Sequence, residues 1–210
     1  MRYILSVLIG YLLGCISPAS MVAKKKNRDL RNEGTGNLGA TNTFLTVGKK
    51  YGFMVMGFDM LKAFIAFRIS QKLLPASIVG GLLGGGAAVV GHVFPFHMKF
   101  KGGKGLAAFA GTVLAYDPTI FVILLVISVS LVLICNYSAA MPMSASLLFP
   151  IMAGVRDRSF AVFFVTSLIC GLIVYKHWEN LLRARDGTDM KVREYLRGHS
   201  EKRSKESHGE

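Results

Sequence analysis

The sequence has few cysteines, and their placement excludes two classes of site. Cys15, Cys135 and Cys170 lie far apart in apolar stretches, with no C-x-x-C pair. Such spacing favours neither a disulfide framework nor a zinc site. We expect the three to be small buried hydrophobic side chains. Since no other metal-ligand cluster is visible, we expect no metal and no other cofactor.

Acidic residues are also scarce, with 12 Asp and Glu against 25 Lys and Arg, a formal net charge of +13. A basic chain of 210 residues usually suggests nucleic acid or an anionic surface as its partner. However, 52% of the residues are hydrophobic and the mean hydropathy is +0.45. This is too apolar for an ordinary soluble domain. We expect a membrane protein with lipid around it and no nucleic-acid partner.

Apolar stretches divide the chain into seven candidate membrane spans. Four are long enough to cross a bilayer alone: Tyr3–Ala23, Tyr51–Ser70, Leu74–Phe94 and Thr119–Cys135. Three are shorter, which a packed bundle tolerates: Gly105–Tyr116, Met143–Val155 and Phe160–Tyr175. The first stretch has its lysines after it rather than before it, so we interpret it as a retained span and not a signal peptide. The predicted fold is an all-α integral membrane protein, a seven-span helical bundle.

The distribution of cations predicts the orientation. If loop 24–50 is cytoplasmic, nineteen Lys and Arg lie in cytoplasmic segments and four lie on the other side. This satisfies the positive-inside rule with the N-terminus outside and the C-terminus in the cytoplasm. Six spans would place a tail with nine cations outside, so an odd number is favoured. We expect one membrane domain over residues 1–190 and a polar, disordered tail over 191–210.

Small and charged residues occur inside the predicted spans. Gly10-x-x-x-Gly14 and Gly81-x-x-x-Gly85 each place two glycines on one helix face. This is typical of close helix packing, with close approach of a ligand as the alternative. Asp59 and Lys62 are three residues apart and share a face. Because unpaired charges in hydrocarbon are costly, we expect an inward-facing pair. A structural role and a substrate-site role both remain open.

The first predicted cytoplasmic loop has the composition of a phosphate site. Its Gly34-x-Gly36-x-x-Gly39 pattern is not a dinucleotide fingerprint, because no strand precedes it. Glycines nevertheless allow successive backbone N–H groups to converge on an anion. Further donors are the side chains of Thr35, Asn37, Thr41 and Asn42. A merely flexible loop is the alternative.

Two further segments lie on the same predicted side of the membrane. Loop 95–105 combines Lys101, Lys104 and three glycines immediately before an apolar helix. The backbone N–H groups of the glycines, the positive charges of the lysines and the dipole of the following helix all favour binding of an anion there. An ordinary basic loop touching anionic lipid is the alternative. At the end of the last span, His177 and Asn180 share one helix face.

Several familiar catalytic motifs are absent from the sequence. There is no H-x-x-x-x-D acyltransferase arrangement, no G-x-S-x-G elbow and no H-E-x-x-H helix. None of the cysteines lies in a cytoplasmic loop as a nucleophile. Two anion loops without a covalent nucleophile suit a reaction between two phosphorylated substrates, one of which is already activated.

These motifs resemble the bacterial acyl-phosphate:glycerol-3-phosphate acyltransferases, the PlsY family. The matching segments are GTGNLGATN at 34–42, GHVFP at 91–95 with FKGGKG at 100–105, and HWEN at 177–180. The similarity runs from about residue 5 to residue 190. It implies transfer of a fatty acyl group from acyl phosphate to the 1-hydroxyl of glycerol 3-phosphate, in the bacterial cell membrane with the active site on the cytoplasmic side. The implied products are lysophosphatidic acid and phosphate.

The resemblance also implies roles for individual residues. The implied catalytic residues are Lys104, His177 and Asn180. The implied substrate-binding residues are Thr35, Gly36, Asn37, Gly39, Thr41, Asn42, His92, Lys101, Gly102, Gly103 and Gly105.

Three departures from the family pattern fall near this site. Thr35 replaces the usual Ser, Leu45 replaces the usual Arg, and residues 136–139 read N-Y-S-A where the family has R-Y-x-S. Loss of an arginine phosphate clamp is not a conservative change. We therefore weigh an active acyltransferase against a divergent paralogue with weak activity or another acceptor. A small anion transporter is a third hypothesis, disfavoured because the ligand residues lie on one side and no internal repeat is visible.

Overall fold

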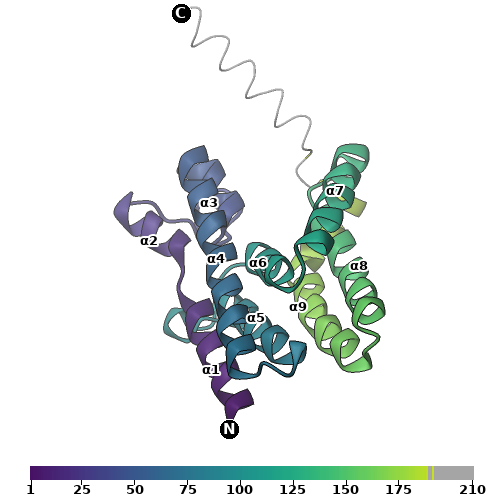
Figure 1. Ribbon diagram of the computed structural model, residues 1–210. Helices are drawn as coiled ribbons and strands as arrows, with labels where there is room; N and C mark the ends of the chain where they lie inside the picture. The colour runs from purple at the N-terminus through teal and green to yellow at the C-terminus, as the bar shows by residue number, and fades with distance from the viewer. Residues whose placement is uncertain (189–190, 192–210) are drawn as a thin grey trace, which may run out of the picture.

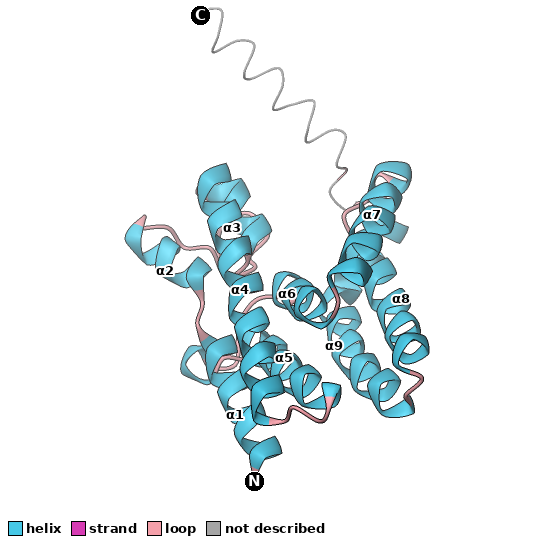
Figure 2. Cartoon of the chain, in the orientation of Figure 1, coloured by secondary structure: helices cyan, strands magenta, loops and turns pink. Residues whose placement is uncertain are grey.

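The computed structural model describes residues 1–188 and 191, and this part of the chain is helical without a β-strand (Figures 1 and 2). Its helices are α1 (Arg2–Cys15), α2 (Pro18–Lys25), α3 (Ala40–Thr46), α4 (Lys49–Leu73), α5 (Ile78–Val93), the 3-10 turn η1 (Phe96–Met98), α6 (Leu106–Tyr116), α7 (Pro118–Cys135), α8 (Ala140–Asp157) and α9 (Phe160–Arg185). Lys191 forms an isolated bridge with Tyr137. The predicted disordered tail otherwise lies outside the described residues.

Helix α5 is the centre of the bundle, packed against α1, α4, α6 and α9. Its glycines allow this. A Cβ at Gly10 of α1 would lie 2.2 Å from the carbonyl oxygen of Gly84, and one at Gly14 would lie 2.2 Å from that of Ala88. Because helix backbone occupies the space in front of these glycines, the close-packing interpretation is confirmed. Figure 1 shows α1 beside α5 on one flank and α8 beside α9 on the other.

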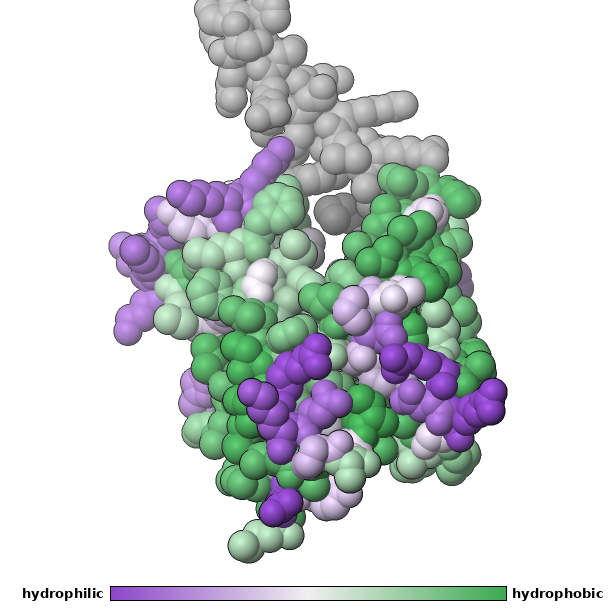
Figure 3. All heavy atoms as spheres, viewed as in Figure 1, coloured by the Kyte–Doolittle hydropathy of each residue, from purple (hydrophilic) through white to green (hydrophobic). Residues whose placement is uncertain are grey.

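The face seen in Figure 3 exposes many apolar side chains, drawn green, beside hydrophilic patches, drawn purple. Large side chains such as Ile4, Ile134 and Phe160 are more than two-thirds exposed. Four helical segments are long and apolar enough to cross a membrane: Arg2–Lys25, Ile78–Met98, Pro118–Cys135 and Phe160–Arg185. An exposed apolar surface on such helices is expected where lipid replaces water. The all-α membrane fold is confirmed, whereas the count of seven crossings and the side on which each terminus lies stay predictions.

The helix boundaries differ most from the sequence expectation at three places. The expected first span is two helices, because the Ser17 side chain accepts a hydrogen bond from the Ser20 N–H and Pro18 occupies the first turn of α2. The third span begins at Ile78 instead of Leu74. The last helix continues to Arg185, ten residues beyond the expected end. His177 and Asn180 therefore lie on a regular helix that continues the span.

A polar cluster ties the far end of α6 to α8. Asp117 caps α7 by accepting hydrogen bonds from the N–H groups of Thr119 and Ile120, at 2.7 and 2.9 Å. The same carboxylate lies 2.8 Å from Arg156 of α8. This ion pair is separated from Lys104 by the length of α6, about 16 Å for 11 residues.

Candidate functional site

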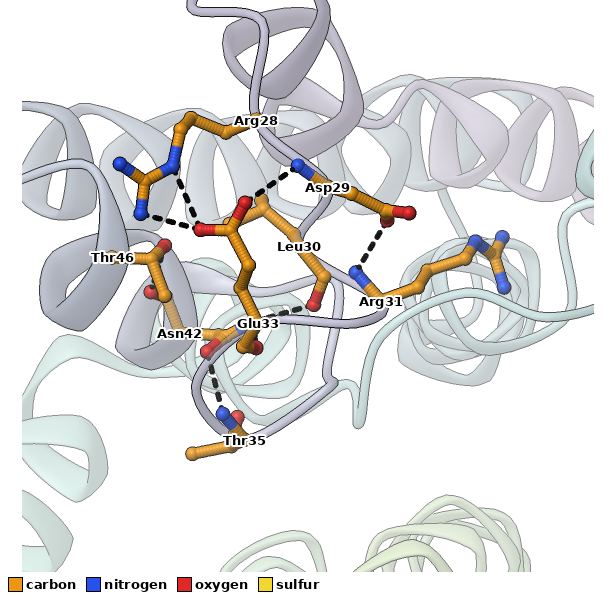
Figure 4. A network of polar contacts seen from close by, with 8 residues as sticks. All are labelled: Arg28, Asp29, Leu30, Arg31, Glu33, Thr35, Asn42 and Thr46. Carbon is orange, nitrogen blue, oxygen red and sulfur yellow. Dashed lines mark hydrogen bonds and ion pairs between the residues drawn. The ribbon is translucent and has the colours of Figure 1, made fainter.

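Asn42 holds the first loop together from within (Figure 4). It is fully buried, and its amide nitrogen donates to the carbonyl oxygens of Leu30, at 2.7 Å, and Glu33, at 3.1 Å. Its amide oxygen accepts a hydrogen bond of 2.8 Å from the Thr35 N–H. All three bonds stay inside the loop. We therefore assign Asn42 to shaping the loop, and its expected direct contact with substrate remains a prediction.

The same loop is braced by charged groups. Arg28 pairs with Glu33, whose carboxylate also accepts from the Asp29 N–H at 3.0 Å. The hydrogen bond from Arg28 lowers the pKa of the Glu33 carboxyl below its ordinary value. Arg31 reaches the second loop, where its guanidinium donates to the carbonyl oxygen of Lys101 at 2.8 Å. The two loops proposed to bind anions are thus joined directly.

Other expected donors of the first loop are accessible. The side chains of Thr35 and Thr41 are exposed, as is Gly36, and Asn37 is half-buried. Gly34 and Gly36 have φ values of +59° and +69°, a region that favours glycine. The network in Figure 4 holds Thr35 by its backbone and leaves its hydroxyl outside. These residues remain candidates for contact with a phosphate.

The second loop folds back onto the end of α5. The Gly102 N–H donates to the carbonyl oxygen of Val93 at 3.0 Å, and the Gly103 N–H donates to that of His92 at 3.1 Å. These two amides shape the loop. They are therefore not available to bind an anion, contrary to the expectation for the glycine amides of this loop. Gly105 has φ +88° and lies between Lys104 and the first turn of α6, which begins at Leu106. The positive charge of Lys104 and the N-terminus of α6 therefore still lie close together, as expected for an anion site.

The second and third motifs meet through Lys104 and Asn180. The Lys104 ammonium donates a hydrogen bond to the side-chain oxygen of Asn180, although 76 residues separate them in sequence. Ile173 brings α9 to this place, because its side chain packs against Gly105 closely enough that a Cβ there would lie 3.0 Å away. Two of the three predicted catalytic residues are therefore in contact.

His177 completes the group on α9. Its side chain is buried, and its Nδ1 lies 2.9 Å from the carbonyl oxygen of Ile173. Since a carbonyl can only accept, Nδ1 must hold the proton and donate. This bond orients the ring and leaves Nε2 as the atom able to accept a hydrogen bond.

His92 is buried in a charged cluster beneath the second loop. Its Nδ1 lies 3.2 Å from Asp59 and 2.9 Å from the Lys62 ammonium, and Asp59 and Lys62 are 2.7 Å apart. The expected inward-facing pair on α4 is confirmed. The sequence did not reveal its link to His92, nor the bridge from Arg31 to Lys101, because both join segments distant in sequence.

Among residues 1–188 and 191, no group of three or more His, Cys, Asp or Glu side chains is placed to hold a metal ion. Cationic side chains at this site include Lys104, which contacts Asn180, and Arg31, which contacts the Lys101 backbone. The absence of a cofactor remains an expectation.

Together, the fold and this site define a helical integral membrane protein whose two glycine-rich loops are joined to each other and, through Lys104, to the last helix. A family model described as glycerol-3-phosphate acyltransferase matches residues 4–187. The chain belongs to the glycerol-3-phosphate acyltransferase family, and an acyltransferase activity follows from this. An anion transporter is correspondingly disfavoured.

Individual relatives agree over nearly the whole chain. The glycerol-3-phosphate acyltransferase of Coxiella burnetii (strain Dugway 5J108-111) is 38% identical, over 92% of this chain and 100% of that protein. That of Aquifex aeolicus (strain VF5) is 35% identical, over 90% and 98%. The crystal structure of PlsY (YgiH), an integral membrane glycerol 3-phosphate acyltransferase, in its glycerol 3-phosphate form is 34% identical. It has a TM-score of 0.85 and covers 91% of this chain and 96% of that chain.

Proposed function

We propose that this protein transfers a fatty acyl group from acyl phosphate to the 1-hydroxyl of glycerol 3-phosphate, giving lysophosphatidic acid and inorganic phosphate. The observation that supports this most is the contact between Lys104 and Asn180. It joins a basic, glycine-rich loop to the helix face of His177, so that a cation for anion binding and a hydrogen-bond acceptor for the hydroxyl are available at one place. The related PlsY structures in glycerol 3-phosphate and lysophosphatidic acid forms support the same acceptor.

The chemistry requires little from the protein besides binding and orientation. The hydroxyl oxygen of glycerol 3-phosphate attacks the acyl carbonyl carbon, and the bond from that carbon to the phosphate oxygen breaks. The departing phosphate accepts the hydroxyl proton, so atoms and charge balance without a covalent enzyme intermediate. Cationic and N–H donors that bind the phosphate as charge develops lower the barrier. Holding two anions side by side supplies much of the remainder.

The described side chains suit these tasks. Lys104 is the cation at the start of α6, where the helix dipole also favours negative charge. Asn180 orients the Lys104 ammonium, and the Nε2 atom of His177 can accept a hydrogen bond from the acceptor hydroxyl. Thr35 and Asn37 of the first loop supply further donors for a phosphate.

We also propose that the site faces the cytoplasm of a bacterial cell, with the N-terminus outside. The nineteen-to-four distribution of cations supports this orientation. Single cysteines at Thr35 and Ser138, in a background without the native three, should resist an impermeant thiol reagent added to intact cells and react after permeabilisation. Labelling of either cysteine from outside would contradict the orientation.

The experiment that tests the reaction is phosphate release by the purified protein. Palmitoyl phosphate should yield inorganic phosphate and lysophosphatidic acid only when glycerol 3-phosphate is added, and chelators should not inhibit. Product formation from palmitoyl coenzyme A alone would contradict the proposed donor. Release without an acyl-glycerol product would contradict the proposed acceptor.

A further inference from the structure

A buried charged cluster lies between the two loops and has no assigned role. It consists of Asp59 and Lys62 of α4 and His92 of α5, whose side chains are 1%, 6% and 7% exposed. Lys62 Nζ lies 2.7 Å from Asp59, 2.9 Å from His92 Nδ1 and 2.6 Å from the carbonyl oxygen of Ile16. An ammonium has three N–H groups, and these are three acceptors. His92 Nδ1 also lies 3.2 Å from the Asp59 carboxylate, so all three side chains of the cluster contact one another.

One bond of this cluster caps the C-terminal end of α1. Ile16 follows the last residue of α1, and the Ser20 N–H, which would continue the helix to the Ile16 carbonyl, is bonded to the Ser17 side chain instead. A carbonyl without a partner is costly inside a membrane protein. Lys62 satisfies it and places a cation at a helix C-terminus, where the dipole favours one. The cluster is thus bonded to the break from which α2 leads into the first loop.

The other end of the cluster contacts the second loop. A Cβ at Gly103 would lie 2.2 Å from His92 Nε2 and 2.6 Å from the carbonyl oxygen of Leu38 in the first loop. The imidazole therefore lies directly against Gly103, the residue before Lys104. Gly103 is thus packed against both the His92 ring and the backbone of the first loop.

We propose that Asp59, Lys62 and His92 form a positioning cluster that holds the two anion loops at a fixed separation and so sets the affinity for glycerol 3-phosphate. Asp59 and Lys62 act through His92 and Ile16, and are positioning residues. The proposal rests on the proposed function. A pair that served stability alone would need no bond to the break after α1 and no ring against Gly103.

Three variants separate positioning from stability. Asp59→Asn/Lys62→Met removes both charges together, so that no unpaired charge remains buried to prevent folding. His92→Asn keeps an acceptor near the position of Nδ1 but removes the ring beneath Gly103. Asp117→Asn/Arg156→Met is the matched control, because it removes an ion pair at the far end of α6.

The assay is phosphate release from palmitoyl phosphate over a range of glycerol 3-phosphate concentrations, with melting temperatures measured on the same samples. Both cluster variants should raise KM for glycerol 3-phosphate by about fivefold or more. The control should leave KM unchanged even where it lowers the melting temperature. Loss of folded protein lowers the maximal rate but not KM, so an unchanged KM in the cluster variants would overturn the proposal.

A second measurement is independent of catalysis. Trypsin should cleave both loops, after Arg31 and after Lys101, faster in the cluster variants than in the control. Unchanged cleavage of both loops would overturn the positioning role whether or not the wild-type protein transfers acyl groups. Absence of wild-type phosphate release would instead contradict the proposed donor, so the two failures are distinguishable.

Discussion

Replacing Asn42 with alanine should open the first loop. The substitution removes three internal hydrogen bonds, to the carbonyl oxygens of Leu30 and Glu33 and from the Thr35 N–H. At a net value of roughly 1 kcal/mol each, the closed loop loses about 3 kcal/mol relative to open forms. Because every 1.4 kcal/mol is a factor of ten, the open population should rise roughly 100-fold.

Limited trypsin digestion measures this population, because cleavage follows the open form when opening and closing are fast. Cleavage after Arg28 and Arg31 should accelerate by a similar factor in Asn42→Ala. Thr35→Ala is the control within the same loop, since only the backbone of Thr35 belongs to the network. An Asn42→Ala protein with wild-type cleavage and lost activity would refute the reasoning. Direct contact with substrate would then be the better explanation.

Three further substitutions test other parts of the structure. Lys104→Met should abolish most glycerol 3-phosphate-dependent phosphate release without lowering the melting temperature, and near-normal turnover would exclude its proposed role. Leu45→Arg should raise kcat/KM for glycerol 3-phosphate roughly tenfold by adding a charge-assisted phosphate contact; an unchanged or lower value would favour the divergent paralogue. Gly91→Ala should destabilise the protein by about 1–3 kcal/mol in thermal unfolding, because its Cβ would lie 2.2 Å from the carbonyl oxygen of Tyr11. The control, Gly57→Ala, has nothing within 4 Å and should not destabilise it.

The sequence predicted which segments form the site better than what each residue does there. Glycines and amide side chains indicate many donors, but composition does not distinguish a donor facing a ligand from one facing its own loop. Asn42 and Gly103 both use their donors internally. The contact of Lys104 with Asn180 could be expected only from the resemblance, because it joins segments 76 residues apart.

The helices likewise combine features that a local pattern predicts with features that depend on distant residues. Apolar runs located the spans, since the pattern is local and long. The break after α1 has a local signal in Ser17 and Pro18, but the continuous hydropathy of that stretch concealed it. What stabilises the break, the Lys62 ammonium, lies 46 residues away and no local pattern predicts it.

The length of α9 affects how a substrate with an apolar acyl chain and a charged phosphate can bind. His177 lies 17 residues after Phe160 on one uninterrupted helix, a rise of about 26 Å. The hydrocarbon layer of a bilayer is about 30 Å thick. A helix that enters the layer near Phe160 therefore brings His177 and Asn180 to the level at which acyl tails give way to head groups. At that depth a fatty chain can stay among lipid tails while its phosphate stays hydrated, so the donor need not leave the membrane to react and the product is formed already in place among the lipids.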